Sequence, residues 1–269
     1  MKNVIYFVFR KHQAELEEYS LFWGCLKRQV KNIFQNVDPR DNIETAEDYS
    51  RNFNKVFCIG LHKTGTRSLH ELFLNLGLRS THNTCWDKGS LFKFVYWHYD
   101  CFSDGGGHFW NSELEFGGNH RVRLLDTSYP CSKFILTARN LDSWLISKMI
   151  HAGWTPETEM IEKIPQRLEH DHWKLKSIDV IIQWIINRNK YHQRVLDYFG
   201  DRPNDLLIIN LSKDKNCVQN VLTFLGIQRR PPAMPWEGRS DTDKSHYKEI
   251  VKKAFLKMGL RESAWSKDI

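Results

Sequence analysis

The segment from Val56 to Leu69 constrains the fold of this 269-residue chain more than any other part of the sequence. It opens on a short apolar run, residues 56–59, which is typical of a buried strand. A loop bounded by Gly60 and Gly65 follows, and from Leu69 the apolar residues recur at the spacing of a helix. The segment therefore predicts a strand, a tight loop and the N-terminus of a helix.

The loop carries the groups that bind a phosphate-like anion. Backbone N–H groups at the start of a helix, together with the positive end of the helix dipole, attract negative charge. Basic and hydroxyl side chains add further donors, and they belong to Lys63, Thr64, Thr66, Arg67 and Ser68. The sequence therefore predicts an anion-binding site between residues 60 and 68.

The spacing of the loop differs from that of loops that bind nucleoside triphosphates. Those loops read G-x-x-x-x-G-K-[ST], in which the Lys contacts the terminal phosphates and the Ser or Thr binds magnesium. Counted from Gly60, this chain has Thr66 at the lysine position and Arg67 at the hydroxyl position, and its lysine lies inside the loop at Lys63. A loop without the magnesium ligand suits an anion of lower charge that needs no metal.

Arg139 follows a second apolar run, residues 133–138. Open α/β sheets bind their ligands at the carboxyl ends of the strands. Ser147 lies about two helical turns further on and can share that surface. A guanidinium and a hydroxyl together suit one phosphate group. With the first loop at the same sheet edge, this arrangement predicts two anion pockets and a ligand with two phosphate-like ends.

Five short, mostly apolar segments have the pattern of strands, and helical patterns separate most of them. This predicts an α/β, P-loop-like three-layer fold, with a central parallel sheet of about five strands flanked by helices. The length indicates one such domain over residues 51–269, preceded by a helical extension over residues 1–50. The predicted strands are residues 55–60, 78–82, 99–103, 133–138 and 205–210.

Charge and composition narrow the class of partner and compartment. The net charge of +7 is spread along the chain without dense basic runs, which favours small anionic ligands or an anionic polymer over nucleic acid. The six cysteines form no C-x-x-C pair, so neither a zinc site nor a disulfide framework is indicated. We saw no apolar run long enough to span a membrane. We therefore expect a soluble, cytoplasmic protein with reduced thiols.

Aromatic residues and glycines crowd together between residues 85 and 116. Aromatic side chains beside glycines suit a shaped pocket or a lid over a ligand. A small aromatic core beneath a long loop explains the same pattern equally well, so both interpretations stay open.

The two anion-binding segments resemble the motifs of the sulfotransferase superfamily, enzymes that use 3′-phosphoadenosine 5′-phosphosulfate (PAPS). Residues 59–69 resemble the 5′-phosphosulfate loop, and residues 133–147 resemble the 3′-phosphate motif, including its spacing from Arg139 to Ser147. Residues 99–104 and 221–226 show weaker similarity. The likeness covers about residues 55–230.

The resemblance implies transfer of a sulfuryl group from PAPS, without a metal, to a hydroxyl or amine of a small-molecule or glycan acceptor. Lys63 would stabilise the leaving phosphate oxygen. The implied cofactor-binding residues are Lys63, Thr64, Gly65, Thr66, Arg67 and Ser68 at the 5′ end, with Arg139 and Ser147 at the 3′-phosphate. A loop of Gly238, Arg239 and Ser240 with Lys244 resembles a cofactor-covering loop of relatives only loosely, and we interpret it as an ordinary start of a helix.

The acceptor also needs a general base, and the resemblance does not decide which residue it is. Related enzymes carry a His or a carboxylate near the end of the second or third strand. Here His82 and Asp104 are the candidates, with His108 close to Asp104. Relative to the family pattern, residues 116–126 form an extra segment, which leaves the residues on the acceptor side undefined.

Two other classes of function remain open from the sequence. A kinase or nucleoside triphosphatase would bind magnesium-ATP at the first loop, although Thr66 and Arg67 disagree with its pattern. A non-catalytic protein could use the same basic site to hold an anionic glycan or nucleotide without turnover. Neither the acceptor nor the oligomeric state can be read from the sequence.

Overall fold

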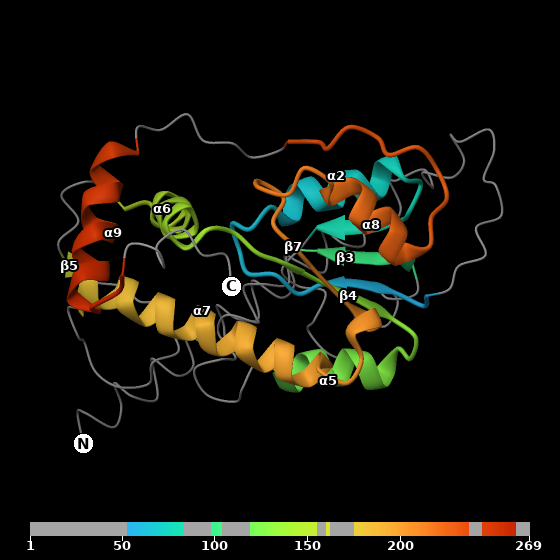
Figure 1. The fold of residues 1–269 in the computed structure, drawn as a ribbon, viewed down its shortest axis with the longest axis horizontal. Coiled ribbons are helices and arrows are strands. Elements are labelled where there is room, and N and C mark those ends of the chain that lie inside the picture. Colours follow the sequence, from blue (N-terminus) through green and yellow to red (C-terminus); the bar gives the residue numbers. More distant parts are fainter. Residues whose placement is uncertain are drawn as a thin grey trace, which may run out of the picture.

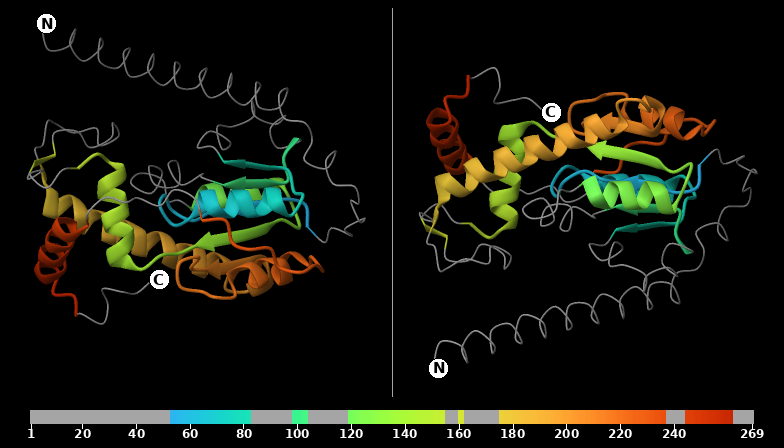
Figure 2. Two further views of the ribbon diagram at one scale, coloured as in Figure 1. Left: turned by 90° about the horizontal axis from the view of Figure 1, so that it is seen from above. Right: turned by 90° about the horizontal axis from the view of Figure 1, so that it is seen from below.

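A computed structural model describes residues 53–82, 98–103, 119–154, 160–161, 175–236 and 244–261. Its centre is a five-stranded, fully parallel sheet with helices on both faces (Figures 1 and 2). This confirms the predicted α/β three-layer fold. The strands of the sheet are β1 Val56–Cys58, β2 Ser80–His82, β3 Cys101–Ser103, β4 Lys133–Thr137 and β7 Leu206–Ile209. The helices are α2 Thr66–Asn75, α5 Asn119–Ser128, α6 Leu141–His151, α7 Ser177–Phe199, α8 Cys217–Leu225 and α9 Ser245–Lys257.

The five strands lie in the order β2-β3-β1-β4-β7. Each predicted strand segment contains one of them, shortened by one or more residues. The first strand in the sequence, β1, lies at the centre of the sheet, where Phe57 is in register with Phe102 of β3 and Phe134 of β4. The loop that follows β1 therefore lies next to the loop that follows β4.

The two faces of the sheet bury separate hydrophobic cores, because successive strand residues point to opposite sides. Phe57 and its neighbours Phe102 and Phe134 pack against the layer that contains α5, α6, α7 and α9. Val56 and Cys58 face the opposite layer, formed by α2 and α8. In Figure 1, α5 and α7 lie below the strands, α2 and α8 lie above them, and α6 and α9 lie to the left.

The layer around α7 reaches beyond the carboxyl ends of the strands. In Figures 1 and 2 the strands point toward α6 and α9, which pack against each other. At the other end, α7 contacts α5, whose Asp126 accepts hydrogen bonds from Tyr198 (2.6 Å) and Arg202 (2.6 Å). The extra segment expected at residues 116–126 thus contributes the first part of helix α5.

Smaller elements complete the described part of the chain. Met160–Ile161 (β5) and Leu175–Lys176 (β6) form an antiparallel pair, and Pro203–Asp205 is a short 3₁₀ helix. Within these described ranges, no helix is long and apolar enough to cross a membrane. The predicted extension at residues 1–50 and most of the aromatic segment at residues 85–116 lie outside the described residues.

Candidate functional site

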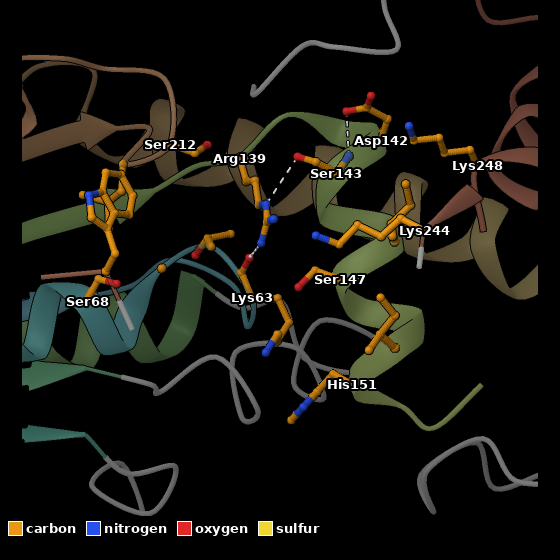
Figure 3. Close-up of a pocket in the computed structure, with 16 residues that line it drawn as sticks. Lys63, Ser68, Arg139, Asp142, Ser143, Ser147, His151, Ser212, Lys244 and Lys248 are labelled. Carbon is orange, nitrogen blue, oxygen red and sulfur yellow. Dashed lines mark hydrogen bonds between the residues drawn. The ribbon is translucent and has the colours of Figure 1, made fainter. Parts of the chain in front are cut away.

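The loops after β1 and β4 line one cavity of about 850 Å³ at the carboxyl edge of the sheet. Both predicted anion pockets are parts of this cavity, because β1 and β4 are adjacent parallel strands. Figure 3 shows residues of both loops facing it. The described residues that line it and can bind a ligand through polar groups are Lys63, Thr64, Gly65, Ser68, Arg139, Asp142, Ser143, Ser147, His151, Ser212, Lys244 and Lys248.

Close packing explains why the first loop is bounded by glycines. A Cβ atom on Gly60 would lie 1.9 Å from the Thr137 hydroxyl oxygen, so any side chain would separate β1 from β4. Gly65 has a φ of +98°, and its Cβ would lie 2.7 Å from Leu211. Only glycine adopts such a backbone conformation readily. Both residues are therefore required by the backbone path of the loop.

Lys63 has a φ of +67°, although it carries a side chain. A residue with a Cβ adopts this left-handed conformation only at a cost, so the surroundings have to hold it. In Figure 3 the side chain of Lys63 extends into the cavity from the loop. The predicted reactive lysine therefore lines the cavity from a strained position.

Four backbone carbonyl groups of the first loop accept hydrogen bonds from side chains. Two of these carbonyls belong to the peptide units on either side of the Cα atom of Lys63. Three donors lie far along the chain, and the fourth, Thr64, lies within the loop. Two of the four donors lie on helices α6 and α7. The bonds run from Tyr191 Oη to Ile59 O (2.6 Å), from Thr64 Oγ1 to Leu61 O (2.6 Å), from Trp144 Nε1 to His62 O (3.0 Å) and from Arg139 Nη1 to Lys63 O (2.9 Å).

The hydroxyl groups predicted to bind phosphate divide into two sets. The Thr64 hydroxyl is buried between Leu61 O and the Thr137 hydroxyl, which lies 2.6 Å away. This hydroxyl supports the loop. Thr64 can contact a ligand in the cavity through its backbone instead. Ser68 is buried and lines the cavity. Among the described lining residues, Thr66 and Arg67 are not found, and Arg67 is exposed.

The first turn of α2 provides the backbone donors that the sequence predicts. Gly65 is the N-cap residue, and no side chain caps the helix. The first N–H groups of a helix have no partner within it and point outward from its end. The loop and α2 can therefore offer amides, a helix dipole and the ammonium of Lys63 to one anion.

Arg139 connects the second segment to the first. Its Nε donates to the Ser143 hydroxyl (3.3 Å), and its Nη1 donates to Lys63 O (Figure 3). Burial lowers the pKa of Arg139 from its ordinary value, and the negative charge of Asp142 opposes this shift. A guanidinium nevertheless keeps its charge in proteins. Arg139 thus offers a fixed positive charge to a ligand in the cavity.

One face of α6 lines the cavity over two turns. Ser143, Ser147 and His151 are spaced four residues apart, which places them on the same side of the helix. The predicted Ser147 lies in the middle of this row. We did not predict Ser143 or His151, although a search at helical spacing from Ser147 would have found both.

The wall opposite the loop comes from the C-terminal part of the chain. Lys244 and Lys248 are one helical turn apart at the start of α9, and in Figure 3 Lys244 points into the cavity. Lys244 is the N-cap of α9, as expected for the start of a helix, and it also lines the cavity. Trp236, half of whose surface is exposed, also lines the cavity. Residues 237–243, including Arg239, lie outside the described residues.

The candidate base His82 lies beside the first loop. Its Nε2 is 3.3 Å from the Thr66 hydroxyl, and its ring lies 5.7 Å from that of His70. Burial, and to a lesser extent the charges of His82 and Arg67, lower the pKa of His70 to about 4. His70 is therefore neutral at pH 7. The other candidates, Asp104 and His108, lie outside the described residues.

The charge of the cavity is strongly positive. Of the described residues that line it, Lys63, Arg139, Lys244 and Lys248 are cationic and Asp142 alone is acidic. The described ranges contain no group of three or more His, Cys, Asp or Glu that could hold a metal ion. The donors present suit an extended anion with more than one charged group.

Comparison with protein families assigns most of the described chain to one family. A family model described as "Sulfotransferase domain" matches residues 55–216, which is more than half of the chain. The match runs from the strand before the first loop to the N-cap of α8, and it includes Arg139 and Ser147. A search of curated proteins finds no match. The chain belongs to the sulfotransferase domain family.

Proposed function

We propose that this protein transfers a sulfuryl group from PAPS to a hydroxyl or amine of an acceptor. The observation that carries the proposal is the shared cavity, in which Lys63 of the first loop and Arg139 of the second are joined by a hydrogen bond. PAPS carries a phosphosulfate at one end of its ribose and a phosphate at the other. A single cavity with cations from two loops suits such a ligand.

The residues present support an assignment of each end of PAPS. The amides at the start of α2, with Lys63 and Ser68, would bind the 5′-phosphosulfate. Arg139 and Ser147 would bind the 3′-phosphate, as the sequence motif implies. Lys244 joins this second group, because it enters the same cavity from α9. The two phosphate sites would then lie on the two loops that the sheet brings together.

The reaction would be an in-line displacement at sulfur. The acceptor oxygen or nitrogen forms a bond to sulfur while the bond from sulfur to the 5′-phosphate oxygen breaks. The electron pair of the broken bond stays on that oxygen, and the ammonium of Lys63 stabilises the charge that develops there. The products are the sulfated acceptor and adenosine 3′,5′-bisphosphate.

The acceptor proton needs a base, and we propose His82 for this role, as the family resemblance implies. Its Nε2 contacts Thr66, the first residue of α2, although neither His82 nor Thr66 is among the described residues that line the cavity. Its neighbour His70 stays neutral at pH 7, so it adds no positive charge next to an imidazole that has to take a proton. Asp104 remains the alternative base from the sequence.

A turnover assay tests the proposal. The full chain is incubated with PAPS labelled in the sulfuryl group and with a panel of small-molecule and glycan acceptors. We expect label on at least one acceptor without added metal. Binding of adenosine 3′,5′-bisphosphate without turnover on any acceptor would favour a non-catalytic protein. Binding of magnesium-ATP with release of phosphate would favour a nucleoside triphosphatase and would overturn the proposal.

A further inference from the structure

We infer that Trp144, and more weakly Tyr191, are positioning residues that orient the backbone amides and the lysine of the first loop. The inference rests on the proposed function of this loop as the 5′-phosphosulfate site. It starts from the four loop carbonyls that accept hydrogen bonds from side chains. Neither Trp144 nor Tyr191 is among the described residues that line the cavity, so both act through the loop.

Fixing a carbonyl group also fixes the N–H group of the next residue. The peptide unit is planar and trans, so the C=O of one residue and the N–H of the following residue point in opposite directions. A carbonyl held against the protein interior therefore turns the next amide the other way. The carbonyl of His62, held by Trp144, sets the amide of Lys63, and the carbonyl of Ile59, held by Tyr191, sets the amide of Gly60.

Lys63 depends on these bonds more than its neighbours do. The peptide plane before the Cα atom of Lys63 contains His62 O, which accepts a hydrogen bond from Trp144. The plane after it contains Lys63 O, which accepts a hydrogen bond from Arg139. These two planes define φ and ψ of Lys63. The left-handed conformation at φ +67° is thus held from both sides, and it determines where the ammonium group enters the cavity.

The indole of Trp144 is itself held firmly. Its exposed fraction is 1%, and two cations lie near its ring: Lys148 Nζ at 5.3 Å and the guanidinium carbon of Arg188 at 5.7 Å from the centroid. Such contacts stabilise both ring and cation. Arg188 also donates from Nη2 to Arg139 O (3.2 Å), so the same group of side chains supports both loops.

Tyr191 lies three residues after Arg188 on α7. Positions i and i+3 of a helix are neighbours, so the two residues share one face of α7. Its ring is fully buried, and its hydroxyl reaches Ile59 at the very start of the loop. The contact lies four residues before Lys63. We therefore infer that Tyr191 fixes the direction in which the loop leaves β1, and that Trp144 fixes the backbone conformation of Lys63.

The test replaces Trp144 by Phe, which keeps an aromatic ring and removes the N–H donor. Trp184→Phe is the matched control, because its ring also lies over Lys148 (4.7 Å) and it is not among the described residues that line the cavity. Calorimetry measures binding of inorganic phosphate and of adenosine 3′,5′-bisphosphate, kinetics measure kcat and KM for PAPS, and thermal unfolding gives the Tm of each variant.

We expect Trp144→Phe to lower kcat and to weaken phosphate binding by roughly tenfold each, since the His62 carbonyl loses its partner. Tyr191→Phe should lower both quantities, but by less than Trp144→Phe does. Trp184→Phe should lower Tm without changing either quantity. If Trp144→Phe behaves like Trp184→Phe in binding and turnover, Trp144 only packs in the core and the inference fails.

A substitute variant and a wild-type binding control distinguish the possible explanations of a negative result. If Trp144→Phe does not fold, benzothienylalanine at position 144 replaces the indole N–H by sulfur and preserves the bicyclic shape, and the same losses are expected. If the wild-type protein binds neither phosphate nor the bisphosphate, the proposed function fails. If the wild type binds both and the position-144 variants bind and react as well as it does, only the positioning role fails.

Discussion

Arg139 donates a hydrogen bond from Nη1 to the carbonyl oxygen of Lys63, at 2.9 Å. Arg139 belongs to the segment that resembles the 3′-phosphate motif, and Lys63 belongs to the segment that resembles the 5′-phosphosulfate loop. The two segments are therefore in direct contact. An arginine that only bound the 3′-phosphate would contribute uniform binding and would affect KM alone. Because this arginine also holds the peptide plane that follows Lys63, its loss should affect both binding and rate.

Arg139→Ala should weaken adenosine 3′,5′-bisphosphate by roughly ten- to a hundredfold, the effect of losing a charge-assisted contact. Adenosine 5′-phosphosulfate, which lacks the 3′-phosphate, should be weakened less, through the disturbed loop alone. Titration calorimetry with both ligands measures the difference, and Arg123→Ala, an exposed change on α5, controls for net charge. Equal losses for the two ligands would mean that Arg139 acts only through the loop.

Adenosine 3′,5′-bisphosphate should stabilise the folded chain without metal, because the unfolded chain has neither loop in place. At a hundredfold excess over its dissociation constant, the free energy of unfolding should rise by about 2.7 kcal/mol. For a chain of this size, that corresponds to a Tm increase of roughly 5 to 10 °C in a thermal-shift assay. A clear shift with magnesium-ATP and none with the bisphosphate would rule out the proposed donor.

Lys63→Ala and Lys63→Gly should both lower kcat by roughly a hundred- to a thousandfold, since both remove the ammonium that stabilises the leaving oxygen. Their stabilities should differ. Glycine accepts the φ of +67° without strain, so the Gly variant should unfold with about 1 to 2 kcal/mol more free energy than the Ala variant. Urea denaturation compares the two. Equal stability of the two variants would show that the loop relaxes away from this conformation.

His82→Gln should lower kcat by roughly a hundred- to ten-thousandfold, the usual contribution of a general base. Gln can still bond the Thr66 hydroxyl but cannot take the acceptor proton, so the affinity for the bisphosphate should not change. The comparison variant is His151→Gln, on the α6 side of the cavity. If His151→Gln causes the greater loss of kcat, the base lies on α6 and the assignment of His82 is wrong.

His70 should make folding sensitive to acid. Its pKa is about 4 in the folded protein, below the ordinary 6.5, so the unfolded state binds more protons between these values. The free energy of unfolding should therefore fall as the pH falls from about 6.5 to 4, by at most about 1.4 kcal/mol per pH unit. Denaturation of wild type and His70→Asn, whose amide can replace the Nδ1 bond to Ser80 (2.8 Å), isolates this contribution. Parallel pH profiles for the two proteins would contradict it.

Local sequence was sufficient to predict the five strands and the two loop segments that line the cavity. A parallel strand buried on both faces reads as a continuous apolar run, so β1 and β4 can be recognised without knowing their neighbours. Gly60 and Gly65 mark a tight loop for a reason that is also local, the freedom of a backbone without Cβ. Whether Lys63, Arg139 and Ser147 bind PAPS remains a prediction.

Tertiary structure decided which residues meet at the site. The sheet order places β1 between β3 and β4, and no local pattern encodes such pairing. Tyr191 contacts Ile59 across 132 residues of sequence, and Lys244 enters the cavity from the far end of the chain. Chain sequence sets which segments become strands, helices and tight loops, because these depend on near neighbours. The side chains that hold the loop carbonyls and complete the cationic cavity are set by packing between distant segments, which only the folded chain brings together.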